Sequence, residues 1–120
     1  MIETTEEEFA TFQESFEACK AWFGLVDFST YFEHGTENTT AAQIAIDIEG
    51  RSAGVALCKE YPEIMQTEGN IEDWARHEAL HLLLADFGAV LKDPTLPESI
   101  KRTTEEALVT RLEHILDTSA

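Results

Sequence analysis

The chain has 120 residues, of which 24 are acidic and 8 are basic, so that its formal net charge is −16. This length predicts a single domain over residues 1–120, and 43% hydrophobic residues suffice for a core. A surface this negative repels phosphate groups, which excludes nucleic acids and acidic membranes as partners. The N-terminus is acidic, unlike a signal peptide, and no apolar run is long enough for a membrane span. We therefore expect a cytoplasmic protein.

The first half of the chain predicts one helix followed by three strands. Apolar residues recur at three- and four-residue steps from Phe9 to Phe23, which predicts an amphipathic helix that ends near Gly24. Apolar and polar residues then alternate, and this period of two predicts strands over residues 25–33, 42–48 and 53–57. Because the links between the strands are short, we expect an antiparallel meander.

The second half of the chain predicts two helices. The helical period runs from Ile71 to about Lys92, and the last helix spans about Glu98 to Asp117. In the first of these helices we expect a buried stripe of Leu80, Leu83, Leu84, Phe87 and Leu91. The order α-β-β-β-α-α thus predicts an α+β fold in one domain.

The sequence His77-Glu78-Ala79-Leu80-His81 lies inside the helix that begins at Ile71. Two histidines four residues apart project from the same face of a helix, so both imidazoles can meet one zinc ion. Glu78 points to the side of that face, where it can take a proton from zinc-bound water as a general base. The spacing therefore predicts a zinc site with a catalytic carboxylate.

Zinc needs a third protein ligand. The metzincin extension of the motif requires glycine and histidine where this chain has Leu84 and Phe87, so the chain is not a metzincin. Asp86 lies too far round the helix from the histidines to share a metal with them. That leaves a carboxylate of the last helix, where Glu105 and Glu106 begin a regular run.

Two segments carry a resemblance to a known family. Residues 74–84 (WARHEALHLLL) and 105–113 (EEALVTRLE) resemble small zincin-like metallopeptidases of the gluzincin type, which phages and prophages often encode. The resemblance implies a minimal zincin-like fold, in which a small antiparallel sheet backs the metal-binding helix.

The same resemblance implies roles for individual residues. In gluzincins the two motif histidines and a glutamate from a downstream helix bind one Zn2+ ion, and the motif glutamate activates water. Carried over to this chain, His77, His81 and Glu106 or Glu105 are the ligands, and Glu78 is the base. We prefer Glu106 because the apolar spacing after it resembles that of the thermolysin ligand helix. Glu105 stays open as the alternative.

Other side chains carry weaker signals. Tyr31, Tyr61 and Arg102 are candidates to stabilise a tetrahedral oxyanion, and nothing in the sequence favours one of them. Trp74, one turn before the motif, either packs under the metal site or completes the core. His34 belongs to a polar stretch, where we expect it to be exposed to solvent.

These observations leave three functional hypotheses. The first is a zinc-dependent metallopeptidase that hydrolyses peptide or protein substrates, with a preference for basic ones, and pairs them with the sheet edge. The second is a zinc-stabilised binding or structural module that catalyses weakly or not at all. The third is an acidic decoy that mimics nucleic acid through its negative charge. The sequence carries no signal for an oligomeric state.

Overall fold

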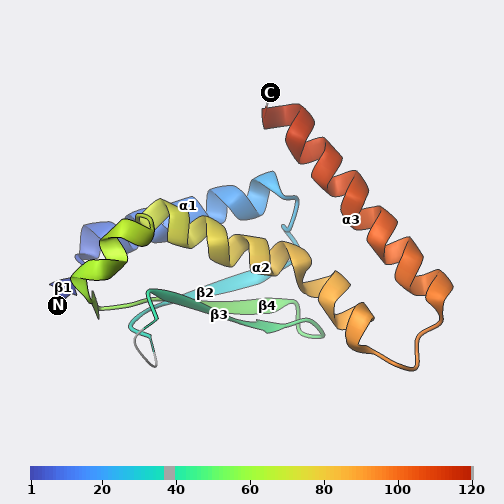
Figure 1. Cartoon of the computed structure of the whole chain (residues 1–120), viewed down its shortest axis with the longest axis horizontal. Helices are drawn as coiled ribbons and strands as arrows, with labels where there is room; N and C mark the ends of the chain where they lie inside the picture. Colours follow the sequence, from blue (N-terminus) through green and yellow to red (C-terminus); the bar gives the residue numbers. More distant parts are fainter. Residues whose placement is uncertain (37–39, 120) are drawn as a thin grey trace.

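The computed structural model of the chain describes residues 1–36 and 40–119, which form an α+β fold of helices over one face of a small sheet (Figure 1). The elements are β1 (Ile2–Glu3), α1 (Glu6–Trp22), β2 (Ser29–His34), β3 (Ala42–Asp47), β4 (Ser52–Leu57), β5 (Glu60–Tyr61), the 3-10 helix η1 (Glu63–Glu68), α2 (Ile71–Lys92) and α3 (Glu98–Ser119). The predicted order is present, with β1, β5 and η1 added to it. Among the described residues, no helix combines the length and the apolarity needed to cross a membrane.

Helix α1 ends close to Gly24, as the sequence predicts. Thr5 and Glu8 form a reciprocal capping box, which satisfies backbone amides at the start of the helix. Gly24 follows the helix with a φ of 74°, and its amide donates to the Ala21 carbonyl. The next amide, that of Leu25, donates to the Lys20 carbonyl at 2.9 Å. Residues 24–25 thus belong to the end of the helix.

For that reason the strand predicted over 25–33 begins only at Ser29. Leu25 and Phe28 are buried, but Val26, which the alternation placed on the buried side, is 77% exposed. The helix end takes the chain through a turn before β2 starts, and alternation alone does not detect that turn.

The predicted antiparallel meander is wrong. The sheet has the order β2-β4-β3, in which β3 and β4 are antiparallel neighbours and β2 lies parallel to β4. Phe32 of β2 and Ile44 of β3 both lie opposite Val55 of the central strand β4. The chain passes from β2 to the far edge of the sheet and then inserts β4 between the two. Period-two alternation fixes the face of each side chain but not the neighbour of each strand.

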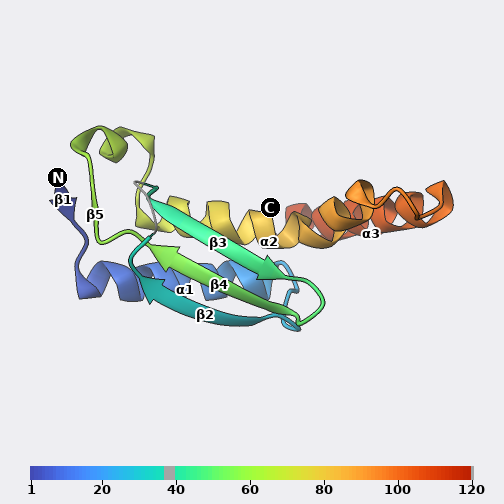
Figure 2. The ribbon, with the colours of Figure 1, turned by 90° about the horizontal axis from the view of Figure 1, so that it is seen from below.

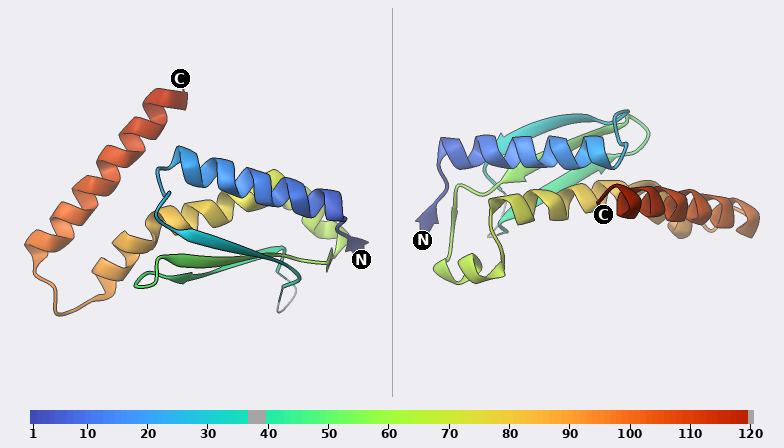
Figure 3. Two further views of the ribbon diagram at one scale, coloured as in Figure 1. Left: turned by 180° about the vertical axis from the view of Figure 1, so that it is seen from behind. Right: turned by 90° about the horizontal axis from the view of Figure 1, so that it is seen from above.

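Helices α1 and α2 lie side by side on one face of this sheet (Figures 2 and 3). The core between them contains Phe12 and Phe16 of α1, Val55 and Leu57 of β4, and Leu82 of α2, each at most 1% exposed. The other face of the sheet is open, so the helical layer alone closes the core.

The buried face of α2 differs from the prediction. Ala75, Ala79, Leu82 and Leu83 face the core, whereas Leu80, Leu84 and Leu91 are 40–52% exposed. Apolar residues occur on both sides of α2, so its period predicts a helix correctly but leaves the buried face ambiguous.

Candidate metal centre

The start of α2 fixes the position of the His-Glu-x-x-His motif. The Asn70 side chain accepts a hydrogen bond from the Asp73 amide at 2.9 Å, and the Asp73 carboxylate accepts one from the Asn70 amide at 3.1 Å. This capping box begins the helix one turn before Trp74 and two turns before the first motif residues. The motif therefore lies within a regular helix.

His77 and His81 converge at the exposed surface of α2. Their Nε2 atoms are 3.2 Å apart and their rings meet edge to face. Two nitrogen ligands of a tetrahedral zinc ion, each about 2.0–2.1 Å from the metal, lie about 3.3–3.4 Å apart. The donor pair thus fits a zinc ion, as the four-residue spacing predicts. The same separation lets one imidazole donate a hydrogen bond to the other in the metal-free protein.

Glu78 lies beside this pair and is buried. Its side chain is 7% exposed, which is unusual for a carboxylate. Burial raises the pKa of Glu78 because it disfavours the charged form, and the nearby His77 and His81 oppose that shift. A raised pKa makes a carboxylate a stronger base, which favours its taking a proton from water.

A hollow of about 360 Å³ opens next to these three residues. It is lined by Thr40, Ala41, Ala42, Met65, Trp74, His77 and Glu78, which come from the start of β3, from η1 and from α2. Most of this lining is apolar, and the histidine and the carboxylate supply its polar side. Sequence spacing did not predict the contributions of β3 and Met65, because they reach the hollow only through tertiary packing.

Within the described residues, no strand pairs with β3 on the side away from β4, so that side is a free edge of the sheet. The Ala41 carbonyl accepts a hydrogen bond from the Cys58 amide at 2.8 Å, so residues 41, 43, 45 and 47 direct their backbone groups to β4. The amides and carbonyls of Ala42, Ile44 and Ile46 therefore point away from β4. Because α2 contacts β3, this edge lies beside the motif helix.

The predicted third ligand is not brought to the histidine pair. In the part of the chain that the structure describes, no group of three His, Cys, Asp or Glu side chains is arranged to hold a metal ion. Glu105 and Glu106 are exposed on α3, which diverges from α2 (Figure 1). The neighbouring residues Thr104 and Leu108 face Leu83 of α2 instead. The described residues thus bring together two candidate nitrogen donors, whereas a catalytic zinc site requires three protein ligands.

Other candidates from the sequence lie in various places. Asp86 binds the Arg51 guanidinium at 2.7 Å. Tyr31 lies on the open face of the sheet, and Tyr61 packs edge to face against Trp74. Trp74 lines the hollow beside the motif and also packs against the core, as the second of its two expected positions has it.

The expected exposure of His34 is wrong. This residue ends β2, is half-buried, and stacks on Phe9 with ring centroids 4.7 Å apart. Its Nε2 atom lies 2.5 Å from the hydroxyl of Thr4, which donates to the Cys58 carbonyl at 2.6 Å. His34 therefore ties the N-terminal segment to the sheet and lies outside the candidate metal centre.

Comparisons of the chain with protein-family models, curated proteins and solved structures found no match.

Proposed function

We propose that the chain is a zinc-dependent metallopeptidase of minimal zincin-like fold, with His77 and His81 as zinc ligands and Glu78 as the general base. The observation that carries the proposal is the 3.2 Å separation of the two Nε2 atoms beside a buried carboxylate. A hydrogen bond between the two rings accounts for the same spacing, but a pair of surface histidines does not require the buried carboxylate beside it. The position of α2 beside the antiparallel edge strand β3 supports the fold assignment.

The residues of the chain divide the reaction between them. When bound, zinc supplies a Lewis acid that lowers the pKa of water to about 7. Glu78 takes the proton of the attacking water and returns a proton to the leaving amine. The free edge of β3 holds the peptide in an extended conformation through backbone hydrogen bonds. The hollow between β3, Met65 and Trp74 accepts one of its side chains.

The proposal includes a third ligand from α3, with Glu106 preferred and Glu105 as the alternative. Helix α3 has to approach the histidine pair for either carboxylate to bind. Two features of α3 are compatible with such a movement: its exposed apolar residues Ile100, Val109 and Leu112, and the hollow that separates it from α2.

The donor set favours one second candidate. A zinc-stabilised binding module needs a bound metal but no efficient hydrolysis, and it tolerates an incomplete or weak site. The absence of a third ligand beside the histidine pair in the described residues is the observation that favours this candidate.

The deciding experiment combines zinc analysis with one substitution. Protein purified without a histidine tag is expected to bind about one zinc per chain, and His77→Ala to abolish that binding. Glu78→Gln is expected to retain zinc and to lose roughly 100- to 10,000-fold in peptide hydrolysis. Glu72→Gln, the same change at an exposed position of α2, is the matched control and leaves both unchanged.

The outcomes separate the candidates. Failure of the wild-type chain to take up added zinc contradicts both the peptidase and the zinc-stabilised module. Zinc binding without detectable hydrolysis favours the module. Undiminished hydrolysis by Glu78→Gln shows that another group is the base.

Alanine substitution on α3 tests the third ligand. We expect Glu106→Ala to weaken zinc binding by more than the roughly 10- to 100-fold typical for losing an outer-shell partner. Glu105→Ala is the matched control, because it removes the adjacent exposed carboxylate from the same helix. A zinc dissociation constant unchanged in both variants would mean that α3 supplies no ligand.

A further inference from the structure

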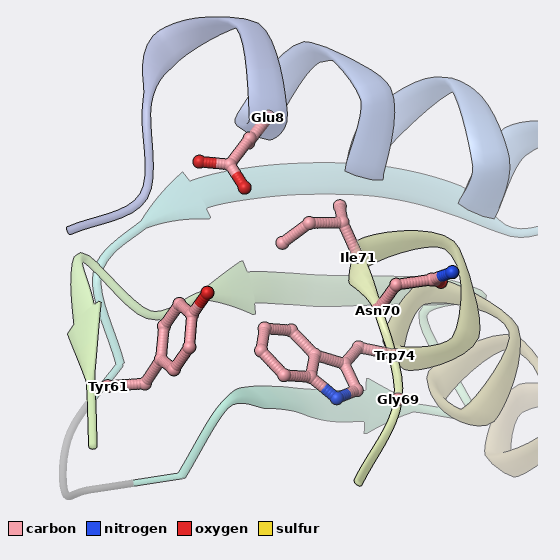
Figure 4. Close-up of a pocket in the computed structure, with 6 residues that line it drawn as sticks. All are labelled: Glu8, Tyr61, Gly69, Asn70, Ile71 and Trp74. Carbon is pink, nitrogen blue, oxygen red and sulfur yellow. The ribbon is translucent and has the colours of Figure 1, made fainter. Parts of the chain in front are cut away.

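A second hollow, of about 230 Å³, lies between the N-terminal ends of α1 and α2 (Figure 4). Its lining consists of Glu8 of α1, Tyr61 of β5, and Gly69, Asn70, Ile71 and Trp74 at the start of α2. Trp74 also lines the hollow beside the candidate metal centre, so one indole borders both. The volume is several times the share of one water molecule, which is about 30 Å³.

The walls of this hollow are aromatic. Tyr61 and Trp74 meet edge to face with ring centroids 5.2 Å apart, and Ile71 lies beside the indole. Tyr61 is only 7% exposed. In Figure 4 its hydroxyl points to the side of the hollow where Glu8 lies.

Among the described lining residues, Glu8 supplies the one carboxylate that faces these rings. The Glu8 side chain is half-buried and points into the same space (Figure 4). Its Oε1 atom accepts the Thr5 amide at 3.0 Å, and a carboxylate has further lone pairs for other donors. Aromatic rings attract cations, and a carboxylate forms charge-assisted hydrogen bonds with ammonium and guanidinium groups. The lining is therefore suited to an organic cation.

The helix ends do not reverse this preference. The start of each helix carries a partial charge of about +0.5, which by itself favours an anion. Three glutamates occupy the first turn of α1, and Glu72 and Asp73 occupy that of α2. These carboxylates exceed the two partial charges, and Arg76, the nearest basic residue of α2, is paired with Asp73.

We propose that this hollow binds the cationic end of a lysine or arginine side chain. Trp74 precedes His77 by three residues, about 4.5 Å along the helix axis, so a peptide at the metal centre reaches the hollow within a few residues. Assigning the cation to a substrate side chain rests on the proposed peptidase function. The binding of the cation itself requires neither zinc nor hydrolysis.

The test is a titration followed by tryptophan fluorescence. Trp22→Phe leaves Trp74 as the only tryptophan, so that the signal reports on the hollow. The probes are Nα-acetyl-lysine amide and Nα-acetyl-arginine amide, whose side chains are cationic, and the uncharged Nα-acetyl-norleucine amide. We expect a saturable change with at least one of the two cations and none with norleucine. The two cationic probes establish which head group the hollow prefers.

Two glutamine substitutions in that background locate the site. Glu8→Gln removes the charge but retains an oxygen for the Thr5 amide, so the capping box and the fold persist. We expect it to weaken cation binding by at least about tenfold. Glu7→Gln makes the same change at an exposed position of the same turn and is expected to have no such effect.

Equal binding of norleucine amide, no binding of either cation, or an unaltered affinity in Glu8→Gln would each overturn the proposal. Cation binding by a chain that proves unable to hydrolyse peptides supports the hollow as a cation site and contradicts the peptidase. The two proposals therefore fail separately.

Discussion

Arg51 joins three parts of the fold through one side chain. It lies at the start of β4, and its guanidinium binds Asp27 before β2 and Asp86 on α2, at 2.6 and 2.7 Å. It also covers the Phe28 ring at 3.9 Å. The backbone of Arg51 has a φ of 48°, which few non-glycine residues adopt. This clamp holds α2 against the sheet and thereby helps to hold the motif helix beside β3.

The Arg51 clamp predicts a pH-dependent stability. The hydrogen bond from Arg51 lowers the pKa of Asp27, so the folded state favours the ionised carboxylate. Its stabilisation is therefore present above the ordinary aspartate pKa of about 3.9 and is lost as the pH falls through the lower folded value. Because Asp27 is about half exposed, we expect Asp27→Asn to cost about 1 kcal/mol or less at neutral pH.

Urea unfolding of the wild type and Asp27→Asn over a pH series measures this effect. The difference in free energy of unfolding is expected to shrink towards zero at acid pH. Glu49→Gln, at an exposed position of the β3–β4 turn close to Arg51, is the matched control and is expected to show no such trend. A difference that grows as the pH falls contradicts the assignment.

At the scale of elements, the edge of β3 is the feature that the proposed reaction uses. The outward amide of Ala42 lies at the start of the strand and borders the hollow beside Glu78. The amide of the next residue, Gln43, is directed to β4 and belongs to the ladder. Proline at position 42 thus removes an outward amide, whereas proline at position 43 removes a hydrogen bond to β4.

Ala42→Pro removes an outward amide at the first position of an edge strand, where proline is tolerated. We expect this variant to fold normally and to lose peptide hydrolysis, because the substrate loses one backbone partner. Gln43→Pro is expected to lower the free energy of unfolding by about 1–3 kcal/mol, the effect of leaving a ladder carbonyl without its partner. Circular dichroism and kcat/KM distinguish the two results. Full hydrolysis by a folded Ala42→Pro variant would exclude substrate pairing at this edge.

Elements that depend on residues close together in the sequence could be predicted, whereas those that depend on distant segments could not. The convergence of His77 and His81 depends on residues four apart and was predicted from the sequence. The caps at Thr5 and Asn70 are equally local, since each involves residues three apart. The order of the strands depends on contacts between distant segments. For this reason the sequence predicted an antiparallel meander and not the parallel pairing of β2 with β4.

The same distinction applies to the sites. The position of Glu78 beside the two histidines could be predicted from the motif, because helix geometry alone determines it. A third ligand from α3 depends on how two helices pack, which no spacing determines. The hollow of Glu8, Tyr61 and Trp74 brings together three segments that are distant in sequence, so it became visible only in the fold.

At the scale of the whole molecule, the charge of −16 limits what can approach either site. A bound zinc ion offsets only two of these charges. A field of one sign attracts oppositely charged ligands and raises their association rates by roughly 10- to 1,000-fold. The cation hollow adds a local preference of the same sign next to the candidate metal centre.

The charge predicts a salt-dependent substrate preference. A lysine-bearing peptide is expected to have a higher kcat/KM than its acidic twin, and this advantage is expected to shrink as NaCl is added. The reason is that salt screens charges beyond about 10 Å at 0.1 M ionic strength. Glu8→Gln separates the effect of the overall charge from that of the cation hollow, because it changes the net charge only from −16 to −15. In that variant the salt dependence of kcat/KM should persist. The higher kcat/KM of the lysine-bearing peptide that remains at high salt should fall. Faster cleavage of the acidic peptide, or a preference insensitive to salt, would show that the overall charge does not select the substrate.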